Sequence, residues 1–344
     1  MKFSRCGLDI AKQVFQVHGV SERGSVKGRR TLARAKVLEY FAQVPACLIG
    51  MEACAGAHYW ARELTELGHT VKLMGAQFVI PYRKSGKNDA NDAEAICEAV
   101  GRPNMHFVAV KSEEQQAVLM VHRARSLLVG HRTALVNQIR GLLGEFGLVV
   151  PQGITRLRAQ LPQLLEDAEN GLPALAREVL AELLERLREF DRRIHGYDLK
   201  LRELARQSEP ARRLMRIGAI GAQTATALVA SMGDPLVFKS ARNYAASLGL
   251  TPRQNSSGGT ARLGRITKQG DRYLRTLLIQ GARSYARVLD KRSDGKSAWV
   301  RRLQQRRHGN IAVVALAAKH ARIAWAMLAK GTEYQPVLSA ELAA

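Results

Sequence analysis

The sequence has few features of a secreted or membrane-spanning protein. It has only four cysteines in 344 residues, and none forms a CxxC pair, which is typical of reduced cytosolic thiols. No stretch approaches the ~20 apolar residues of a bilayer-spanning helix, and the N-terminus has no secretory signal pattern. The nine histidines are scattered without zinc-finger spacing. We therefore expect a cytoplasmic protein without a structural zinc site.

Acidic residues are scarce in the C-terminal third. The whole chain carries 53 Lys and Arg against 30 Asp and Glu, a net charge of +23. Residues 210–330 contain 23 basic and four acidic residues. Such an excess indicates a polyanionic partner, and nucleic acid and an anionic membrane both meet this criterion. The length is sufficient for two domains and a connector.

The first third of the chain alternates between strand-like and helical patterns. The predicted strands cover residues 3–9, 14–20, 25–30, 46–51, 70–74 and 106–110. A helix that begins at Thr31 separates the third strand from the fourth, and a second helix precedes the fifth. A further helix is expected over residues 88–100. This order predicts an α/β layer with a mixed sheet.

The middle of the chain has a heptad pattern. A long helix is predicted from Ser112 to about Phe146, where Pro151 follows. After it, apolar residues recur with alternating spacings of four and three, which is typical of a coiled coil. They are Ala176, Leu180, Leu183, Leu187, Phe190, Ile194, Tyr197, Leu201 and Leu204. The pattern can pack inside an antiparallel hairpin or between protomers; we favour pairing between protomers and leave both open.

Two glycines, Gly218 and Gly221, lie between apolar helical segments and resemble a helix-hairpin-helix. Such a tight turn would direct backbone N–H groups and a helix N-terminus at a phosphate. Helix packing through small residues gives a similar pattern. A polar loop is expected over residues 251–264, followed by helices at 271–289 and 311–329.

Four acidic residues stand where an apolar strand ends or a helix begins. Asp9 ends the first predicted strand, Glu52 ends the fourth, and Asp89 and Asp92 share one face of the following helix. Converging carboxylates repel one another unless a cation offsets their charge. Hard oxygen ligands select Mg²⁺ or Mn²⁺, and two such ions ~4 Å apart can assist phosphoryl transfer. We predict a divalent-metal site at these residues.

Other interpretations of the acids are weaker. Asp89 and Asp92 could simply favour the positive end of their helix. An aspartate after a first strand also begins sugar-kinase and actin-like ATPase folds, but the glycine-rich phosphate loop that those folds need does not follow here. An RNase H-like nuclease fold agrees better with the arrangement.

A glycine- and serine-rich segment, residues 249–270, carries Ser257 among basic residues. A serine in this setting could attack a phosphorus atom whose charge the cations neutralise. Alternatively, the loop could bind phosphate only through hydrogen bonds, and the residues alone leave both possibilities open. The residues expected to contact nucleic acid are Arg253, Arg262, Arg265, Lys268, Arg272 and Arg275.

Four motifs occur together in one order along the chain. They are GLDIAK with Asp9, the strand-end Glu52, KNDANDA with Asp89 and Asp92, and GLTPRQNSSGG followed by RLGRITKQGDRYLRTLL. In this combination the sequence resembles the DEDD-type insertion-sequence transposases, the family one-ten group related to the Piv invertase. The resemblance covers nearly the whole chain.

The resemblance implies a fold and a division into domains. We expect an α/β RNase H-like (RuvC-like) catalytic domain over residues 1–110 and a helical coiled-coil connector for dimerisation over 111–208. A mainly α, basic transposase domain with the helix-hairpin-helix-like segment and the serine loop follows over 209–331, and 332–344 form a tail.

The resemblance also implies a chemistry and partners. Asp9, Glu52, Asp89 and Asp92 would hold the metal, and Ser257 would form a covalent phosphoserine link to DNA. The adjacent Ser256 is the second candidate nucleophile. A structured guide RNA from the element and a dimer or tetramer, in which one subunit's carboxylates meet another's serine, are expected. The alternatives are a RuvC-like junction-resolving nuclease that uses metal-activated water, and a non-catalytic nucleic-acid-binding protein.

Overall fold

The computed structural model describes residues 2–84, 86, 88–258, 260 and 262–336. These residues form two compact units. The first comprises the residues up to Glu113 together with Met232–Lys239, and the second comprises Glu114–Ser231 and the residues from Ser240 onward.

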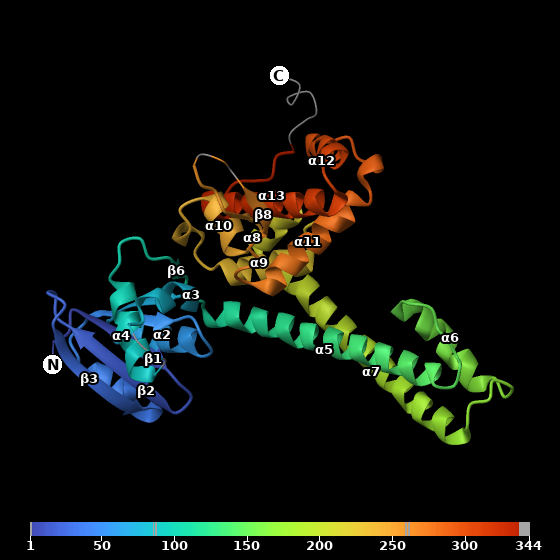
Figure 1. Cartoon of the computed structure of the whole chain (residues 1–344), viewed down its shortest axis with the longest axis horizontal. Helices are drawn as coiled ribbons and strands as arrows, with labels where there is room; N and C mark the ends of the chain where they lie inside the picture. Colours follow the sequence, from blue (N-terminus) through green and yellow to red (C-terminus); the bar gives the residue numbers. More distant parts are fainter. Residues whose placement is uncertain (1, 85, 87, 259, 261, 337–344) are drawn as a thin grey trace. The chain divides into compact units, whose positions relative to one another are not determined.

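The first unit is built on a six-stranded sheet (Figure 1). The strands are β1 (Arg5–Ile10), β2 (Val14–Val20), β3 (Val26–Ala33), β4 (Leu48–Glu52), β5 (Thr70–Met74) and β6 (Phe107–Val108). Their order is β3-β2-β1-β4-β5-β6, with β1, β4 and β5 parallel and the other pairings antiparallel. The first five strands thus have the order of an RNase H-like sheet, and the predicted mixed sheet is confirmed.

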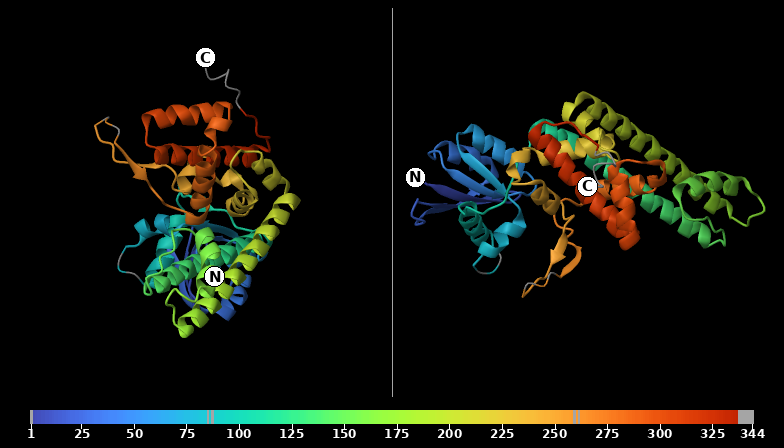
Figure 2. Two further views of the ribbon diagram at one scale, coloured as in Figure 1. Left: turned by 90° about the vertical axis from the view of Figure 1, so that its right-hand side faces the viewer. Right: turned by 90° about the horizontal axis from the view of Figure 1, so that it is seen from above.

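Helices cover both faces of this sheet (Figure 2). They are η1 (Arg34–Lys36), α1 (Val37–Ala42), α2 (Ala57–Glu66), α3 (Ala76–Val79), η2 (Ile80–Tyr82) and α4 (Asp89–Val100), and η3 (Pro235–Val237) belongs to the same unit. A hydrophobic core joins the sheet to α1 and α2 through Leu8, Phe15, Phe41 and Trp60. α4 covers the opposite face.

The prediction that Thr31 begins a helix is wrong. β3 continues through Ala33, and the Thr31 hydroxyl donates to Oε1 of Gln16 at 2.9 Å across the β2–β3 pair. A β-branched residue suits this strand position. The first α-helix therefore begins only at Val37.

The second unit is mainly helical. Its helices are α5 (Glu113–Gly144), α6 (Ile154–Glu166), α7 (Ala174–Gln207), α8 (Glu209–Met215), α9 (Ala222–Met232), α10 (Ala241–Ser247), α11 (Arg272–Ala286), η4 (Leu289–Lys291), α12 (Gly295–Arg306) and α13 (Gly309–Lys330). A mixed sheet followed by a mainly helical region agrees with the coarse outline of the predicted fold.

The long helices α5 and α7 run antiparallel. Arg125 Nε lies 2.7 Å from Asp198 Oδ1, and Arg132 Nη1 lies 3.0 Å from Asp191 Oδ1. A step of seven residues forward along α5 thus corresponds to seven residues back along α7. The buried heptad positions Leu180 and Leu187 belong to one core with residues of α5 and α6. The antiparallel hairpin, one of the two alternatives, accounts for these buried positions.

The segment expected to be a polar loop contains a small hairpin. β7 (Pro252–Gln254) pairs antiparallel with β8 (Leu263–Ile266), and both strands are largely exposed. The pattern was missed because both strands are short and polar, so neither shows an alternation between apolar and polar residues. The hairpin carries the serine segment between its strands.

The expectation that no segment is long and apolar enough to span a bilayer is wrong for α13. Gly309–Lys330 meets that criterion by length and composition. Such a helix is weak evidence for a membrane span, because core helices have the same composition. One face of α13 is buried inside the second unit, with Leu316, Ala317 and His320 almost fully covered.

Candidate active site

Asp9 and Glu52 lie beside each other on one face of the sheet. β1 and β4 pair in parallel with Leu8 opposite Met51, so the next residues of the two strands are neighbours. Side chains alternate between the two faces of a strand. Asp9 therefore shares a face with Gly7, and Glu52 shares it with Gly50. Both carboxylates stand at the carboxyl end of their strands, at half-buried positions.

This face is the one that α4 covers, and two glycines allow the close approach. A Cβ atom on Gly7 would lie 2.1 Å from the carbonyl oxygen of Ala93, and one on Gly50 would lie 2.7 Å from Cβ of Val100. Any larger residue at Gly7 would collide with the helix backbone. The missing side chains therefore let α4 lie directly against β1 and β4.

The direction of α4 brings its first turn to the carboxylates. Its later part lies near the start of β1, where Cys97 Sγ contacts the carbonyl oxygen of Arg5. Its N-terminus therefore lies at the end of β1, next to Asp9. Asn88 caps the helix, because its side chain accepts a hydrogen bond from the backbone N–H of Asn91 at 2.8 Å. Asp89 and Asp92 occupy the first turn, as predicted.

The four carboxylates influence one another electrostatically. Burial, followed by the negative charges of Asp89, Asp92 and Glu52 in that order of importance, raises the pKa of Asp9 to about 6. The positive end of α4 and any bound cation would act in the opposite direction. The structure thus brings together the four acids that the sequence singled out, in an environment that favours a cation.

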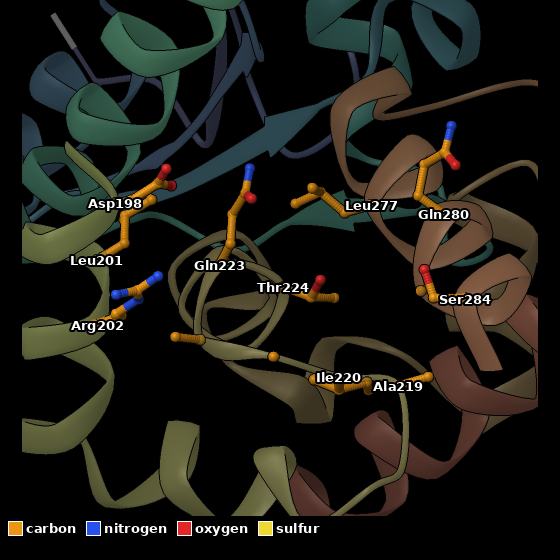
Figure 3. A pocket seen from close by; sticks show the side chains of 13 residues that line it. Asp198, Leu201, Arg202, Ala219, Ile220, Gln223, Thr224, Leu277, Gln280 and Ser284 are labelled. Carbon is orange, nitrogen blue, oxygen red and sulfur yellow. The ribbon is translucent and has the colours of Figure 1, made fainter. Parts of the chain in front are cut away.

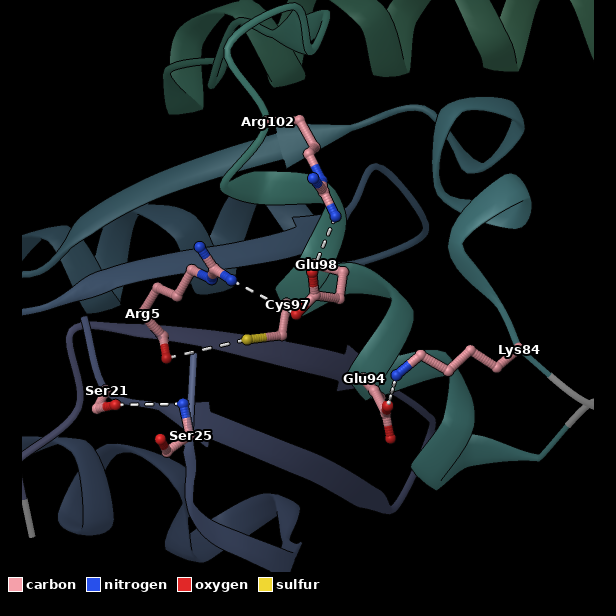
Figure 4. Close-up of polar contacts among 8 residues, drawn as sticks. All are labelled: Arg5, Ser21, Ser25, Lys84, Glu94, Cys97, Glu98 and Arg102. Carbon is pink, nitrogen blue, oxygen red and sulfur yellow. Dashed lines mark hydrogen bonds and ion pairs between the residues drawn. The ribbon is translucent and has the colours of Figure 1, made fainter. Parts of the chain in front are cut away.

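The other acids of α4 have basic partners (Figure 4). Glu94 pairs with Lys84 at 2.8 Å, and Glu98 pairs with Arg102 at 3.2 Å and Arg5 at 3.4 Å. These ion pairs lie on the later turns of the helix. Their charges are balanced locally, so they do not compete for a cation at the first turn.

Among the acids of the cluster, Asp92 has a basic partner, Arg83, whose Nη1 lies 3.2 Å from its Oδ1. Within the described part of the chain, Asp9 and Asp89 have no ion pair. Arg83, which lies nine residues before its partner, is not among the residues that the sequence pattern indicated. Its place directly ahead of an acidic helix start was the signal that could have identified it.

The carboxylate cluster, defined as Asp9, Glu52, Asp89 and Asp92, fits a hard divalent cation by its chemistry. It offers carboxylate oxygens and an excess of negative charge. In the described residues, however, no three acidic, histidine or cysteine side chains converge closely enough to hold one ion. A bound cation would need Asp92 to turn from Arg83 and the carboxylates to move together.

The hairpin of the second unit presents Ser256 and Ser257 near its tip. Gln254 Nε2 donates to Ser256 Oγ at 2.9 Å, and the backbone N–H of Arg262 donates to it at 3.3 Å. The backbones of Ser257 and Thr260 form an isolated antiparallel β-bridge, in which the Thr260 N–H donates to the Ser257 carbonyl oxygen at 3.0 Å. The Ser257 hydroxyl is exposed and has no hydrogen-bond partner among the described residues. The two adjacent serines therefore have different surroundings.

Five of the six basic residues expected to contact nucleic acid are exposed: Arg253, Arg262, Arg265, Lys268 and Arg272. Arg275 differs, because only 8% of it is exposed. Its Nη1 donates to the carbonyl oxygens of Leu248 at 2.9 Å and Gln269 at 2.8 Å. Arg275 therefore ties the two ends of the hairpin segment to α11, a structural role in place of the predicted contact with nucleic acid.

Comparisons with known proteins place both sites in one family. Residues 6–147 match the DEDD transposase domain of that family, and residues 211–298 match the family described as "Transposase IS116/IS110/IS902 family". A "Probable family 20 transposase" of Pseudomonas aeruginosa is 51% identical over 98% of this chain and 100% of its own length. The chain belongs to the IS110/IS116/IS902 family of transposases.

Two further relatives of this transposase are named for insertion sequences. The transposase for insertion sequence element IS1328 of Yersinia enterocolitica is 40% identical, over 95% of this chain and 97% of its own. The transposase for IS1111A of Coxiella burnetii is 42% identical, over 96% and 90% respectively. The transposase is thus a DNA-binding, DNA phosphoryl-transfer enzyme, and its DEDD domain implies the use of divalent metal.

Proposed function

We propose that this transposase cuts and rejoins the DNA of its insertion sequence with two sets of groups. The carboxylate cluster of a RuvC-like domain holds Mg²⁺ or Mn²⁺, and the Ser257 hydroxyl is the nucleophile. Two observations support the proposal: the lack of ion pairs at part of the carboxylate cluster, and the different surroundings of the two adjacent serines. Asp9 and Asp89 of the cluster have no ion pair among the described residues, and Ser257 keeps an exposed hydroxyl while Ser256 is engaged in the loop.

The serine chemistry is an exchange of phosphodiester bonds. The Ser257 oxygen bonds to a DNA phosphorus, the bond from that phosphorus to a sugar oxygen breaks, and the serine proton passes to solvent or a neighbouring base. The released sugar oxygen takes up a proton. A hydroxyl of another strand then attacks the phosphoserine and frees Ser257, so the bond energy is conserved. The exposed Arg253, Arg262 and Arg265 would balance the charge that develops on phosphorus.

Asp9, Glu52, Asp89 and Asp92 are the residues that would hold the metal. When bound, a divalent cation supplies Lewis-acid stabilisation of phosphate oxygens. The protein residues themselves orient the cation: β1 and β4 fix Asp9 and Glu52, and the capped first turn of α4 fixes the two aspartates. Arg83 balances Asp92 while no cation is present.

We further propose an RNA partner, a dimer or tetramer, and action in the cytoplasm. The charge of +23 is compatible with binding RNA as well as DNA. The half-buried heptad residues of α7 leave area for contact between protomers. The four free cysteines are compatible with a reducing compartment. Sequencing the nucleic acid that copurifies with the transposase tests the RNA partner, and sedimentation tests the assembly.

The central test is capture of a covalent protein–DNA adduct. The full-length transposase, with the nucleic acid that copurifies, is incubated with labelled element-end DNA and Mg²⁺ and then analysed on a denaturing gel. We expect Ser257→Ala to abolish the adduct and Ser256→Ala to retain it. Loss of the adduct only in Ser256→Ala would move the nucleophile to Ser256. Cleavage without an adduct in both variants would favour the junction nuclease with water as nucleophile.

A metal control separates the two parts of the proposal. Asp9→Asn should bind DNA as tightly as the unchanged protein, yet form no adduct at any Mg²⁺ or Mn²⁺ concentration. Full activity of Asp9→Asn would exclude the carboxylate cluster from the reaction, leaving the serine assignment to stand by itself.

A further inference from the structure

The second unit contains a cavity of about 580 Å³ where α7, α9 and α11 meet (Figure 3). It lies on the helix-hairpin-helix-like turn that the proposed chemistry does not use. Its wall includes the turn residues Ala219 and Gly221, the first turn of α9 with Thr224, Arg202 from α7 and Ser284 from α11. All of these residues belong to the second unit.

The first turn of α9 faces this cavity with unused hydrogen-bond donors. The first backbone N–H of α9 with a partner is that of Ala225, which donates to Gly221 at 2.9 Å. In the described residues, the N–H groups of Ala222, Gln223 and Thr224 have no acceptor. Gly221 has no side chain to cap them, and the first turn has no acidic residue. Such a helix end attracts an anion.

Thr224 provides an independent sign of a ligand. Only 7% of this residue is exposed, and it lines the cavity. Its hydroxyl has no hydrogen-bond partner among the residues that the structure describes. The residue is buried, but its hydroxyl is accessible from the cavity, so a ligand or water there can supply the missing hydrogen bond. The neighbouring Thr226 differs, because its hydroxyl donates to the carbonyl oxygen of Ala222 at 2.8 Å.

The charge of the cavity wall suits an anion. Arg202 extends from α7 toward α9 (Figure 3), and it has no ion pair with any described residue. Asp198 is the acidic residue of the lining, and its carboxylate is already paired with Arg125 Nε at 2.7 Å. The wall therefore presents one unbalanced positive charge together with the positive end of α9.

The turn is held rigidly in a strained shape. Ala219 has a φ of 82°, in the region that disfavours a side chain. Its carbonyl oxygen would lie 2.4 Å from a Cβ atom on Gly281, so this glycine lets the turn pack on α11. Strain of this kind persists where the surroundings enforce it, commonly at ligand sites.

α9 is also fixed from the side of α5. The Thr226 hydroxyl contacts His122 Nε2 at 3.0 Å, and His122 Nδ1 contacts the Tyr273 hydroxyl at 2.9 Å. Gln223 Nε2 donates to the same Tyr273 hydroxyl at 3.0 Å. Burial lowers the pKa of His122 to about 4, so its ring is neutral and can donate at one nitrogen and accept at the other. The donors of the first turn are thus held in place before any ligand binds.

We propose that this cavity binds one phosphodiester group of a nucleic-acid backbone. The N–H groups of Ala222, Gln223 and Thr224 and the Thr224 hydroxyl would donate to the phosphate oxygens, and Arg202 would supply the charge. The cavity is larger than a phosphate, so the flanking sugars would contact Leu201, Ile220 and Leu277. The proposal does not depend on the serine nucleophile or on the metal.

The test measures binding by the full-length transposase freed of copurifying nucleic acid. Fluorescein-labelled 30-base-pair DNA and an RNA duplex of the same sequence serve as probes. We expect Thr224→Val and Arg202→Gln each to weaken binding of one probe by about fivefold to tenfold. Thr224→Ser, which keeps the hydroxyl, should bind normally. Arg206→Gln, the matched loss of charge on α7 outside the cavity, should weaken binding less than twofold.

Single methylphosphonate substitutions locate the phosphate. At one position, a neutral methylphosphonate should weaken binding by the unchanged protein about as much as Arg202→Gln does. The Arg202→Gln variant should bind this substituted probe no more weakly than the unsubstituted probe. The Arg206→Gln variant should still show the full loss of affinity on the substituted probe. The probe on which this coupling occurs identifies the backbone as DNA or RNA. Absence of coupling on both probes, or normal binding by Arg202→Gln, which alters only an exposed side chain, would overturn the proposal.

Discussion

Gly7 of β1 lies directly beneath the carbonyl oxygen of Ala93 in α4, with space for a hydrogen atom but not for a methyl group. This contact sets the distance between the helix and the sheet. It therefore sets how closely Asp89 and Asp92 approach Asp9. A packing glycine thus controls the geometry of the carboxylate cluster without taking part in its chemistry.

Gly7→Ala should displace α4 and disrupt the cluster. We expect a loss of about 1–3 kcal/mol in the free energy of unfolding, as for other overpacked cores, and weaker Mn²⁺ binding. Urea unfolding and titration calorimetry measure the two effects. Gly130→Ala is the matched control, because no atom would lie within 4 Å of its added Cβ in α5. Unchanged stability and metal binding in Gly7→Ala would contradict the close contact.

Asp9→Asn should stabilise the metal-free protein. The substitution removes a half-buried charge from three negative neighbours. We expect the melting temperature in EDTA to rise by about 3 °C, corresponding to about 1 kcal/mol. The further rise that Mg²⁺ produces in the unchanged protein should disappear. A lower melting temperature in EDTA would indicate that Asp9 makes a stabilising contact instead.

Arg83→Gln should strengthen metal binding. The guanidinium now balances Asp92, and a divalent cation has to compete with it. Removal of this charge should lower the Kd for Mn²⁺ by about threefold to tenfold. Arg102→Gln removes an equivalent charge that pairs with Glu98 on a later turn of α4, and its Kd should stay close to that of the unchanged protein. Weaker binding by Arg83→Gln would assign Arg83 a supporting role instead.

His320 should make the second unit sensitive to acid. Burial, then the charges of Lys296 and Lys319, lowers its pKa to about 3. Since the unfolded value is about 6.5, protons bind the unfolded chain more readily. The stability it contributes is complete above pH 6.5 and falls by about 1.4 kcal/mol per pH unit between pH 6.5 and 3.

Urea unfolding at several pH values, followed by tryptophan fluorescence, measures this slope. His320→Leu should reduce it, at little other cost because Nε2 of His320 has no hydrogen-bond partner among the described residues. The exposed His195 provides the control, and His195→Gln should leave the slope unchanged. An equal slope in His320→Leu would assign the pH dependence to other groups, His122 first.

The sequence predicted the helices and strands whose conformation depends on residues adjacent in the chain. β5 and α4 follow the predicted ranges almost to the residue, because an apolar run and an Asn88 cap are local signals. The local pattern predicts a helix at Thr31, but the pairing of β3 with β2, which no local pattern shows, determines its conformation. The β7–β8 hairpin was missed for the same reason.

For the site, the sequence by itself determined which carboxylates end β1 and β4 and begin α4, since each position follows from a local pattern. Only the tertiary structure decided that they lie near one another, because α4 has to cross the sheet at Gly7 and Gly50 with its first turn over the strand ends. It also decided which of two adjacent serines has a hydroxyl without a partner, and that Arg275 is buried. These outcomes depend on packing between residues far apart in the chain, where sterics and burial select one arrangement from many that the local sequence permits.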